Sequence, residues 1–147
     1  MRDFPAFNRE TIGQADCPSP LAFAQDASFI PKSGKHTFGL DKFWNGSHSR
    51  VEKGLELSLI AVLDSRTAAA FALSAAQTPP NLARKKDKAG KSRIDFYLEH
   101  LRQTAASLPK SVRYGIFDGF YAKQKFVSGV CQLGFQLICR LRLRRSI

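Results

Sequence analysis

The stretch LAFAQDASFI, residues 21–30, is the part of the sequence that decides the fold. It is an apolar, strand-like run with one carboxylate, Asp26, in its middle. Burying an ionised carboxylate in an apolar strand is costly unless a cation meets it. A second apolar run, VRYGIFD at residues 112–118, ends on Asp118, and Gly119 follows at once. If the two strands lie side by side and parallel, both carboxylates converge at one edge of the sheet, where they would hold a divalent cation.

The remaining apolar patterns alternate between the periods of strands and helices. Prolines and glycines separate these segments, and Asp64-Ser65-Arg66-Thr67 supplies turn chemistry for a hairpin. The Ala-rich run 68–75 is also compatible with a helix on propensity, and this alternative stays open. We predict, in chain order, a strand at 21–29, an irregular connection at 31–54, a hairpin of strands 55–63 and 68–75, a helix from Arg93 to Leu108 stopped by Pro109, a strand at 112–117, a helix at 120–133 with Gly134 as its C′ residue, and a strand at 135–139.

The composition indicates one basic domain that binds a polyanion. The 147 residues are 44% hydrophobic, enough for a single core, and the formal charge of +11 favours nucleic acid as partner, with a membrane surface as the competing reading. No run approaches the roughly 18 apolar residues of a spanning helix and residues 1–20 hold no secretory segment, so a cytoplasmic protein is expected. Three cysteines without CxxC spacing and three histidines without a ligand pattern argue against a disulfide framework and a zinc site. We divide the chain into a leader at 1–20, a folded domain at 21–141 and a basic tail at 142–147.

Two basic regions are candidates for contact with DNA. The connection at 31–54 interleaves cations with aromatic side chains, which suits binding of a phosphate backbone together with stacking on bases. For Phe43 and Trp44 the alternative, that they tuck against the sheet, stays open. The run LARKKDKAGKSR, residues 82–93, holds six Lys or Arg against one Asp and suits a solvated segment that touches phosphates. The residues assigned to DNA binding are Lys32, Lys35, His36, Arg50 and Lys53 of the connection, and Lys123 and Lys125 on the polar face of the helix predicted at 120–133.

Five blocks of the sequence together resemble one protein family. They read DASFIPKSGKHTFGLDKFWNG (26–46), SRVEKGLELSLIAV (49–62), ALSAAQTPP (72–80), RIDFYLEHLRQ (93–103) and DGFYAKQKFVSGV (118–130). In this order they closely resemble the DDE-type transposases of bacterial insertion sequences, and the similarity spans roughly Phe7 to Leu141.

The resemblance implies a metal-dependent polynucleotidyl transferase with a ribonuclease H-like fold. The expected fold is a mixed α/β sheet of five strands with flanking helices, in which the first and fourth strands are neighbours and each presents an acid. Such enzymes use three carboxylates to bind two Mg²⁺ ions (or Mn²⁺) for phosphoryl transfer. Carried over, the first acid is Asp26 and the second is Asp118. The competing roles are an ion pair with Lys or Arg for Asp26, and a cap on the helix near Phe120 for Asp118.

The sequence also departs from the family pattern. The third acid, a glutamate on a later helix, has no counterpart before Ile147, and Glu52, Glu56 and Glu99 lie in blocks whose family counterparts are not the catalytic glutamate. We therefore expect a truncated transposase domain, incomplete at its C-terminus and inactive alone, with one face of its sheet partly uncovered. The expected partners are DNA at transposon ends and a second copy or a full-length transposase. The alternative function is a non-catalytic basic DNA-binding fragment that modulates a full-length transposase.

Overall fold

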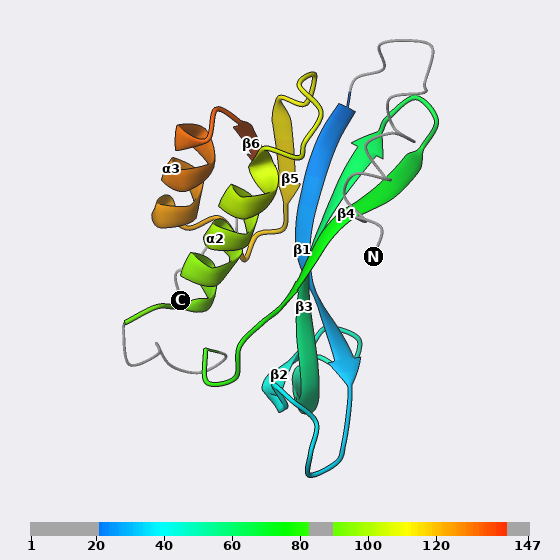
Figure 1. Cartoon of the computed structure of the whole chain (residues 1–147), viewed down its shortest axis with the longest axis vertical. Helices are drawn as coiled ribbons and strands as arrows, with labels where there is room; N and C mark the ends of the chain where they lie inside the picture. Colours follow the sequence, from blue (N-terminus) through cyan, green and yellow to red (C-terminus); the bar gives the residue numbers. More distant parts are fainter. Residues whose placement is uncertain (1–20, 83–89, 141–147) are drawn as a thin grey trace, which may run out of the picture.

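The computed structural model of the chain describes residues 21–82 and 90–140. The expected leader at 1–20, most of the basic run at 82–93 and the expected tail at 142–147 lie outside these residues. The described part forms one sheet with helices packed beside it (Figure 1). Its elements are β1 (Leu21–Pro31), β2 (Asp41–Asn45), β3 (Arg50–Asp64), β4 (Ala69–Gln77), α2 (Arg93–Ala105), β5 (Tyr114–Phe117), α3 (Gln124–Gln132) and β6 (Gln136–Cys139).

The sheet is mixed, with an antiparallel half and a parallel half that meet at β1. β3 pairs antiparallel with β1, β2 and β4. β5 lies parallel to β1, and β6 lies parallel to β5. The first predicted strand therefore neighbours the fourth, as the ribonuclease H-like arrangement requires, and the α/β fold class is confirmed.

Within residues 21–82 and 90–140 the sheet already has six strands, so the predicted number of five is wrong. The missed strand is β2, which forms a hairpin with the first residues of β3, from Asp41 opposite Gly54 to Asn45 opposite Arg50. Only alternate residues of β2 face inward: Phe43 and Asn45 are buried, while Lys42 and Trp44 are exposed. Because Lys42 and Lys53 lie opposite each other on the exposed side and polar residues surround Phe43, Trp44 and Val51, residues 31–54 show no apolar run, although their backbones pair.

The hairpin of β3 and β4 is confirmed, and the helical alternative for the Ala-rich run is wrong. The Asp64 carboxylate accepts hydrogen bonds from the amides of Arg66 at 2.9 Å and Thr67 at 3.3 Å, which closes the turn between the strands. Eight residues of β4 then pair with β3. Pairing with a long neighbouring strand thus overrides the helix propensity of alanine.

In the described part of the chain, α2 and α3 form a second layer over one face of the sheet (Figure 1). α2 begins with a capping box in which Ser92 and Asp95 exchange hydrogen bonds, and it ends at Ala105, three residues before the predicted end. α3 begins at Gln124 rather than 120, and Gly134, with φ of 85°, follows it in the left-handed conformation as predicted. The core between the layers includes Phe23, Ile60, Val62, Tyr97, Leu101, Phe117, Phe126 and Val130.

The other face of the sheet carries no helix within residues 21–82 and 90–140. It exposes Leu59, Tyr114, Ile116 and Ile138 in part. No helix in these residues is long and apolar enough to cross a membrane.

Candidate active site

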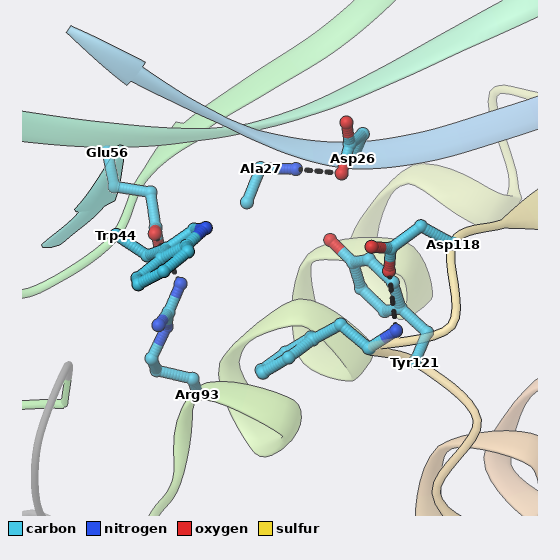
Figure 2. A pocket seen from close by; sticks show the side chains of 8 residues that line it. Asp26, Ala27, Trp44, Glu56, Arg93, Asp118 and Tyr121 are labelled. Carbon is cyan, nitrogen blue, oxygen red and sulfur yellow. Dashed lines mark hydrogen bonds and ion pairs between the residues drawn. The ribbon is translucent and has the colours of Figure 1, made fainter. Parts of the chain in front are cut away.

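Strand register brings Asp26 and Asp118 to the same place. Ala24 of β1 lies opposite Ile116 of β5 in the parallel ladder, and each acid lies two residues further along its strand direction. Both acids line a pocket of about 430 Å³ at this end of the strands, together with Ala27, Trp44, Glu56, Arg93, Phe120 and Tyr121. Figure 2 shows Asp26, Asp118 and Tyr121 gathered on one side of the pocket, and Trp44, Glu56 and Arg93 on the other.

Asp26 is exposed, so the expectation of a carboxylate buried within the strand is wrong. Alternation along β1 puts Phe23 and Gln25 into the core and leaves Asp26 outside it. Among the described residues no ion pair involves Asp26, and its Oδ1 accepts only the Ala27 amide, at 2.8 Å. Partial burial raises the pKa of Asp26, the Ala27 amide lowers it, and the negative charge of Asp118 raises it further. The Lys or Arg partner that we considered for Asp26 is thus not found in the described part of the chain.

The buried polar residue of β1 is Gln25, which the sequence reading did not single out. Its Nε2 donates to the Ser58 hydroxyl and to the Tyr97 carbonyl, both at 3.0 Å. Gln25 therefore ties β1 to β3 and to α2 next to Asp26 in the sequence, while its Oε1 has no hydrogen-bond partner among the described residues.

Asp118 closes a turn instead of capping a helix. Its Oδ1 accepts the Phe120 amide at 2.8 Å and its carbonyl accepts the Tyr121 amide at 3.2 Å, while α3 begins only at Gln124. The turn fixes the carboxylate at the end of β5 and occupies one of its two oxygens. The helix-cap alternative is wrong for α3, and the turn leaves the second oxygen of Asp118 able to bind a ligand.

Tyr121 is a site residue that the sequence reading missed. Its ring packs against Phe117, Phe126 and Tyr97, and only 1% of the residue is exposed. Its hydroxyl has no hydrogen-bond partner among the described residues and points into the pocket beside the Asp118 carboxylate (Figure 2). Burial raises the pKa of Tyr121 most, and the charges of Tyr97, Asp26 and Asp118 add to the rise. A neutral hydroxyl donor therefore lies beside two acids.

A third carboxylate in the pocket, Glu56, is fully engaged by its neighbours. Glu56 is 3% exposed and forms an ion pair with Arg93. It also accepts hydrogen bonds from the Tyr97 hydroxyl at 2.5 Å and from the Thr78 hydroxyl at 2.9 Å. Burial raises the pKa of Tyr97, and the negative charge of Glu56 raises it further. Glu56 thus stabilises the pocket wall, and its oxygens are not free to bind a metal.

The sequence did not decide whether Phe43 and Trp44 pack against the sheet or remain exposed, and the structure places them differently. Phe43 is buried, whereas Trp44 is 54% exposed and lines the pocket. Alternation along β2 separates them, because neighbouring residues of a strand face opposite sides.

None of the seven residues assigned to DNA binding lines the acid pocket. Arg50 and Lys125 form ion pairs with Glu52 and Asp95. All seven are exposed: Lys32, Lys35 and His36 lie in the loop after β1, Arg50 and Lys53 on β3, and Lys123 and Lys125 at the start of α3. Their role in DNA binding stays a prediction.

The residues of the pocket suit a hard divalent cation held partly by a substrate. No group of three or more His, Cys, Asp or Glu that could hold a metal occurs among the described residues, so they offer no all-protein cage. Asp26, Asp118 and the orphaned Tyr121 hydroxyl are all oxygen donors, and Mg²⁺ is commonly bound by one or two carboxylates with substrate phosphates and water. This donor set fits Mg²⁺ or Mn²⁺ better than zinc.

Comparison with known proteins adds the family. No curated protein matches the sequence. The family model described as DDE superfamily endonuclease matches residues 8–147, nearly the whole chain. The mixed sheet with flanking helices is consistent with the ribonuclease H-like fold of that family, whose members are transposase-like nucleases that act on DNA. The chain therefore belongs to the DDE superfamily endonucleases.

Proposed function

We propose that this chain cleaves DNA strands at the Asp26–Asp118 pocket as an insertion-sequence transposase, with DNA transposition as the process it serves. The observation that carries the proposal is the convergence of the two acids from neighbouring parallel strands on one pocket, without an ion-pair partner for either within the described residues. Two carboxylates side by side repel each other, and a shared cation removes that repulsion.

We further propose that Asp26 and Asp118 hold Mg²⁺ or Mn²⁺. When bound, the cation supplies Lewis-acid stabilisation of the charge that develops on a phosphate during strand cleavage. The turn of Asp118 fixes the direction of one carboxylate, and β1 fixes the other. Tyr121 offers its hydroxyl proton to an oxygen at the same site, and the aromatic cluster around its ring prevents it from turning away.

The proposal includes low activity of the isolated chain. The family mechanism uses three carboxylates, and the only further acid in the pocket, among the described residues, is Glu56. Its bonds to Arg93, Tyr97 and Thr78 would have to break before it could bind a metal. Two free carboxylates would bind the cation less tightly than three, so cleavage should be slow and should need a high concentration of Mg²⁺ or Mn²⁺.

The engagement of Glu56 by its neighbours and the high positive charge favour a second candidate function. With Glu56 engaged and a formal charge of +11, the chain suits a basic DNA-binding protein that does not cut. In that role it would occupy transposon ends, or pair with a full-length transposase or a second copy, and so modulate transposition.

The test is nicking of supercoiled DNA by the purified chain with Mg²⁺ or Mn²⁺. Asp26→Asn and Asp118→Asn should each lower the nicking rate at least about 100-fold, since even the supporting partners of metal ligands are worth 10–100-fold. Glu99→Gln is the matched control, because Glu99 is an exposed acid on α2 that does not line the pocket. Equal nicking by wild type and both pocket variants would refute cleavage at this site.

A binding measurement separates the two candidate functions. If the wild type binds DNA but no nicking occurs with either metal, the non-catalytic role is supported. Its affinity should then fall steeply with salt, with a log–log slope near −0.9 for each duplex phosphate contact. A flat salt dependence would contradict that role.

A further inference from the structure

Trp44 is an exposed indole in the wall of the acid pocket. It is 54% exposed, although the other residues of its strand that flank it, Phe43 and Asn45, are buried. Figure 2 shows the ring beside Arg93, across the pocket from Asp118. Trp44 is also the sole tryptophan of the chain. An indole left half in water keeps a large apolar face available for a flat partner.

The position of Trp44 is fixed by backbone pairing. β2 pairs with the start of β3 over its whole length, and Trp44 lies opposite Val51. A one-residue shift would expose Phe43 and bury Lys42, so the pairing holds the indole outward. The exposed face of the Trp44 ring is therefore preformed, which reduces the entropy lost when a ligand binds.

The face of the hairpin that carries Trp44 is also positively charged. Lys42 lies two residues before Trp44, on the same side of the strand, and Lys53 lies directly opposite Lys42. Like charges opposite each other on a sheet are unfavourable, and a polyanion would relieve their repulsion. Within the pocket, Arg93 adds a planar guanidinium, which lies 5.3 Å from the centre of the Phe120 ring.

We propose that Trp44 forms a stacking subsite for one unpaired base of the DNA strand whose phosphate lies at Asp26 and Asp118. The place of that phosphate rests on the proposed function. Inside a duplex both faces of a base are covered by its neighbours, so only an unpaired base can lie against the indole. The pocket of about 430 Å³ lies within the usual range for ligand sites. The chain should therefore prefer single-stranded or locally melted DNA.

Because Trp44 is the sole tryptophan, its fluorescence reports directly on this subsite. The full chain is titrated in EDTA with a thymidine oligonucleotide of about 15 residues and with a hairpin-closed duplex of similar length. Stacking should quench the emission in a saturable manner with the single strand, and far less with the duplex. Binding of the single strand without quenching would overturn the proposal, and so would equal quenching by both DNAs.

Variants test whether the ring supplies affinity. Trp44→Ala should weaken binding of the labelled oligonucleotide on the order of tenfold, whereas Trp44→Phe should stay within about threefold of the wild type, because a phenyl ring still stacks. Tyr114→Ala is the matched control, because Tyr114 is a 44% exposed aromatic residue on β5 that neither lines the pocket nor lies in the connection at 31–54, and it should bind like the wild type. Equal losses in Tyr114→Ala and Trp44→Ala would refute a specific subsite. If Trp44→Ala does not fold, Trp44→Phe and the quenching titration decide.

The same titration keeps this inference separate from the proposed function. Asp26→Asn should lower the nicking rate at least about 100-fold and retain quenching. Absence of nicking by the wild type with quenching intact would reject cleavage and keep the subsite, and nicking without quenching would do the opposite.

Discussion

The covered face of the sheet and the acid pocket differ in how their polar groups are paired. Beneath the helices, His100 is held by the hydroxyls of Ser58 and Ser74, each at 2.9 Å, and the Gln25 Nε2 donates to Ser58 and Tyr97, although the Gln25 Oε1 has no partner within the described residues. In the pocket, Asp26 and Asp118 carry like charges side by side, and the Tyr121 hydroxyl has no partner within the described residues. The hydrogen bonds of the covered face stabilise the fold, whereas the unpaired polar groups of the acid pocket are able to bind a ligand.

The largest effect on the covered face should come from Phe23→Ala. Phe23 is fully buried and meets the rings of Phe117 and Phe135 edge to face. Its truncation should lower the free energy of unfolding by about 3–5 kcal/mol, the usual cost of losing a buried phenyl ring. Urea unfolding followed by circular dichroism measures this. A loss below about 1 kcal/mol would show that the covered face does not carry the stability.

Tyr121→Phe sharpens the comparison, because it removes one hydroxyl and keeps the ring. We expect the nicking rate to fall about tenfold, as for the loss of one hydrogen bond worth about 1.4 kcal/mol in the transition state. The free energy of unfolding should not fall, since the hydroxyl has no partner among the described residues. A clear loss of stability with normal nicking would assign Tyr121 to the covered face instead.

His100 tests the covered face through pH. Burial lowers the pKa of His100 below its ordinary value of 6.5, so the unfolded chain takes up a proton before the folded chain does. The free energy of unfolding should therefore fall as the pH drops below about 6.5, by at most about 1.4 kcal/mol per pH unit for this single group. Urea unfolding between pH 8 and pH 5 should show a shallower pH dependence for His100→Gln than for the wild type. Equal slopes would mean that His100 titrates freely.

The smallest effect is expected for Asp26→Asn on stability. Replacing one carboxylate removes its repulsion with Asp118, and no ion pair of Asp26 with a described residue is lost. The free energy of unfolding measured in EDTA should stay equal or rise by up to about 1 kcal/mol. A decrease of more than about 1 kcal/mol would mean that Asp26 supports the fold, and the contrast between the two regions would fail.

The sequence predicted those features that depend on local patterns. Apolar, β-compatible runs and the Asp64 turn predicted the β3–β4 hairpin. The parallel neighbours β1 and β5 were expected from the resemblance to the ribonuclease H-like arrangement and not from a local pattern. The placement of Asp26 and Asp118 at one pocket follows from that pairing.

The features that the sequence did not predict depend on pairing between distant segments. β2 is specified by its backbone partner in β3 and not by an apolar run. The sequence predicted that Asp26 is buried, because LAFAQDASFI is apolar along most of its length. The structure shows that its neighbour Gln25 faces inward, where it bonds to α2. The pocket also includes Glu56 from β3, Arg93 from α2 and Tyr121 from the turn after β5. Because these residues come from separate parts of the chain, their spacing in the sequence does not predict the pocket.

β1 supplies a core phenyl ring at Phe23 and a pocket acid at Asp26 from a single stretch of backbone. Since these two positions have opposite parity, inserting or deleting one residue between Phe23 and Asp26 would turn an alanine inward or drive the carboxylate under the helices. Collapse of the domain and loss of the candidate site would then coincide. Natural variation within this strand should consequently consist of replacements and never of length changes.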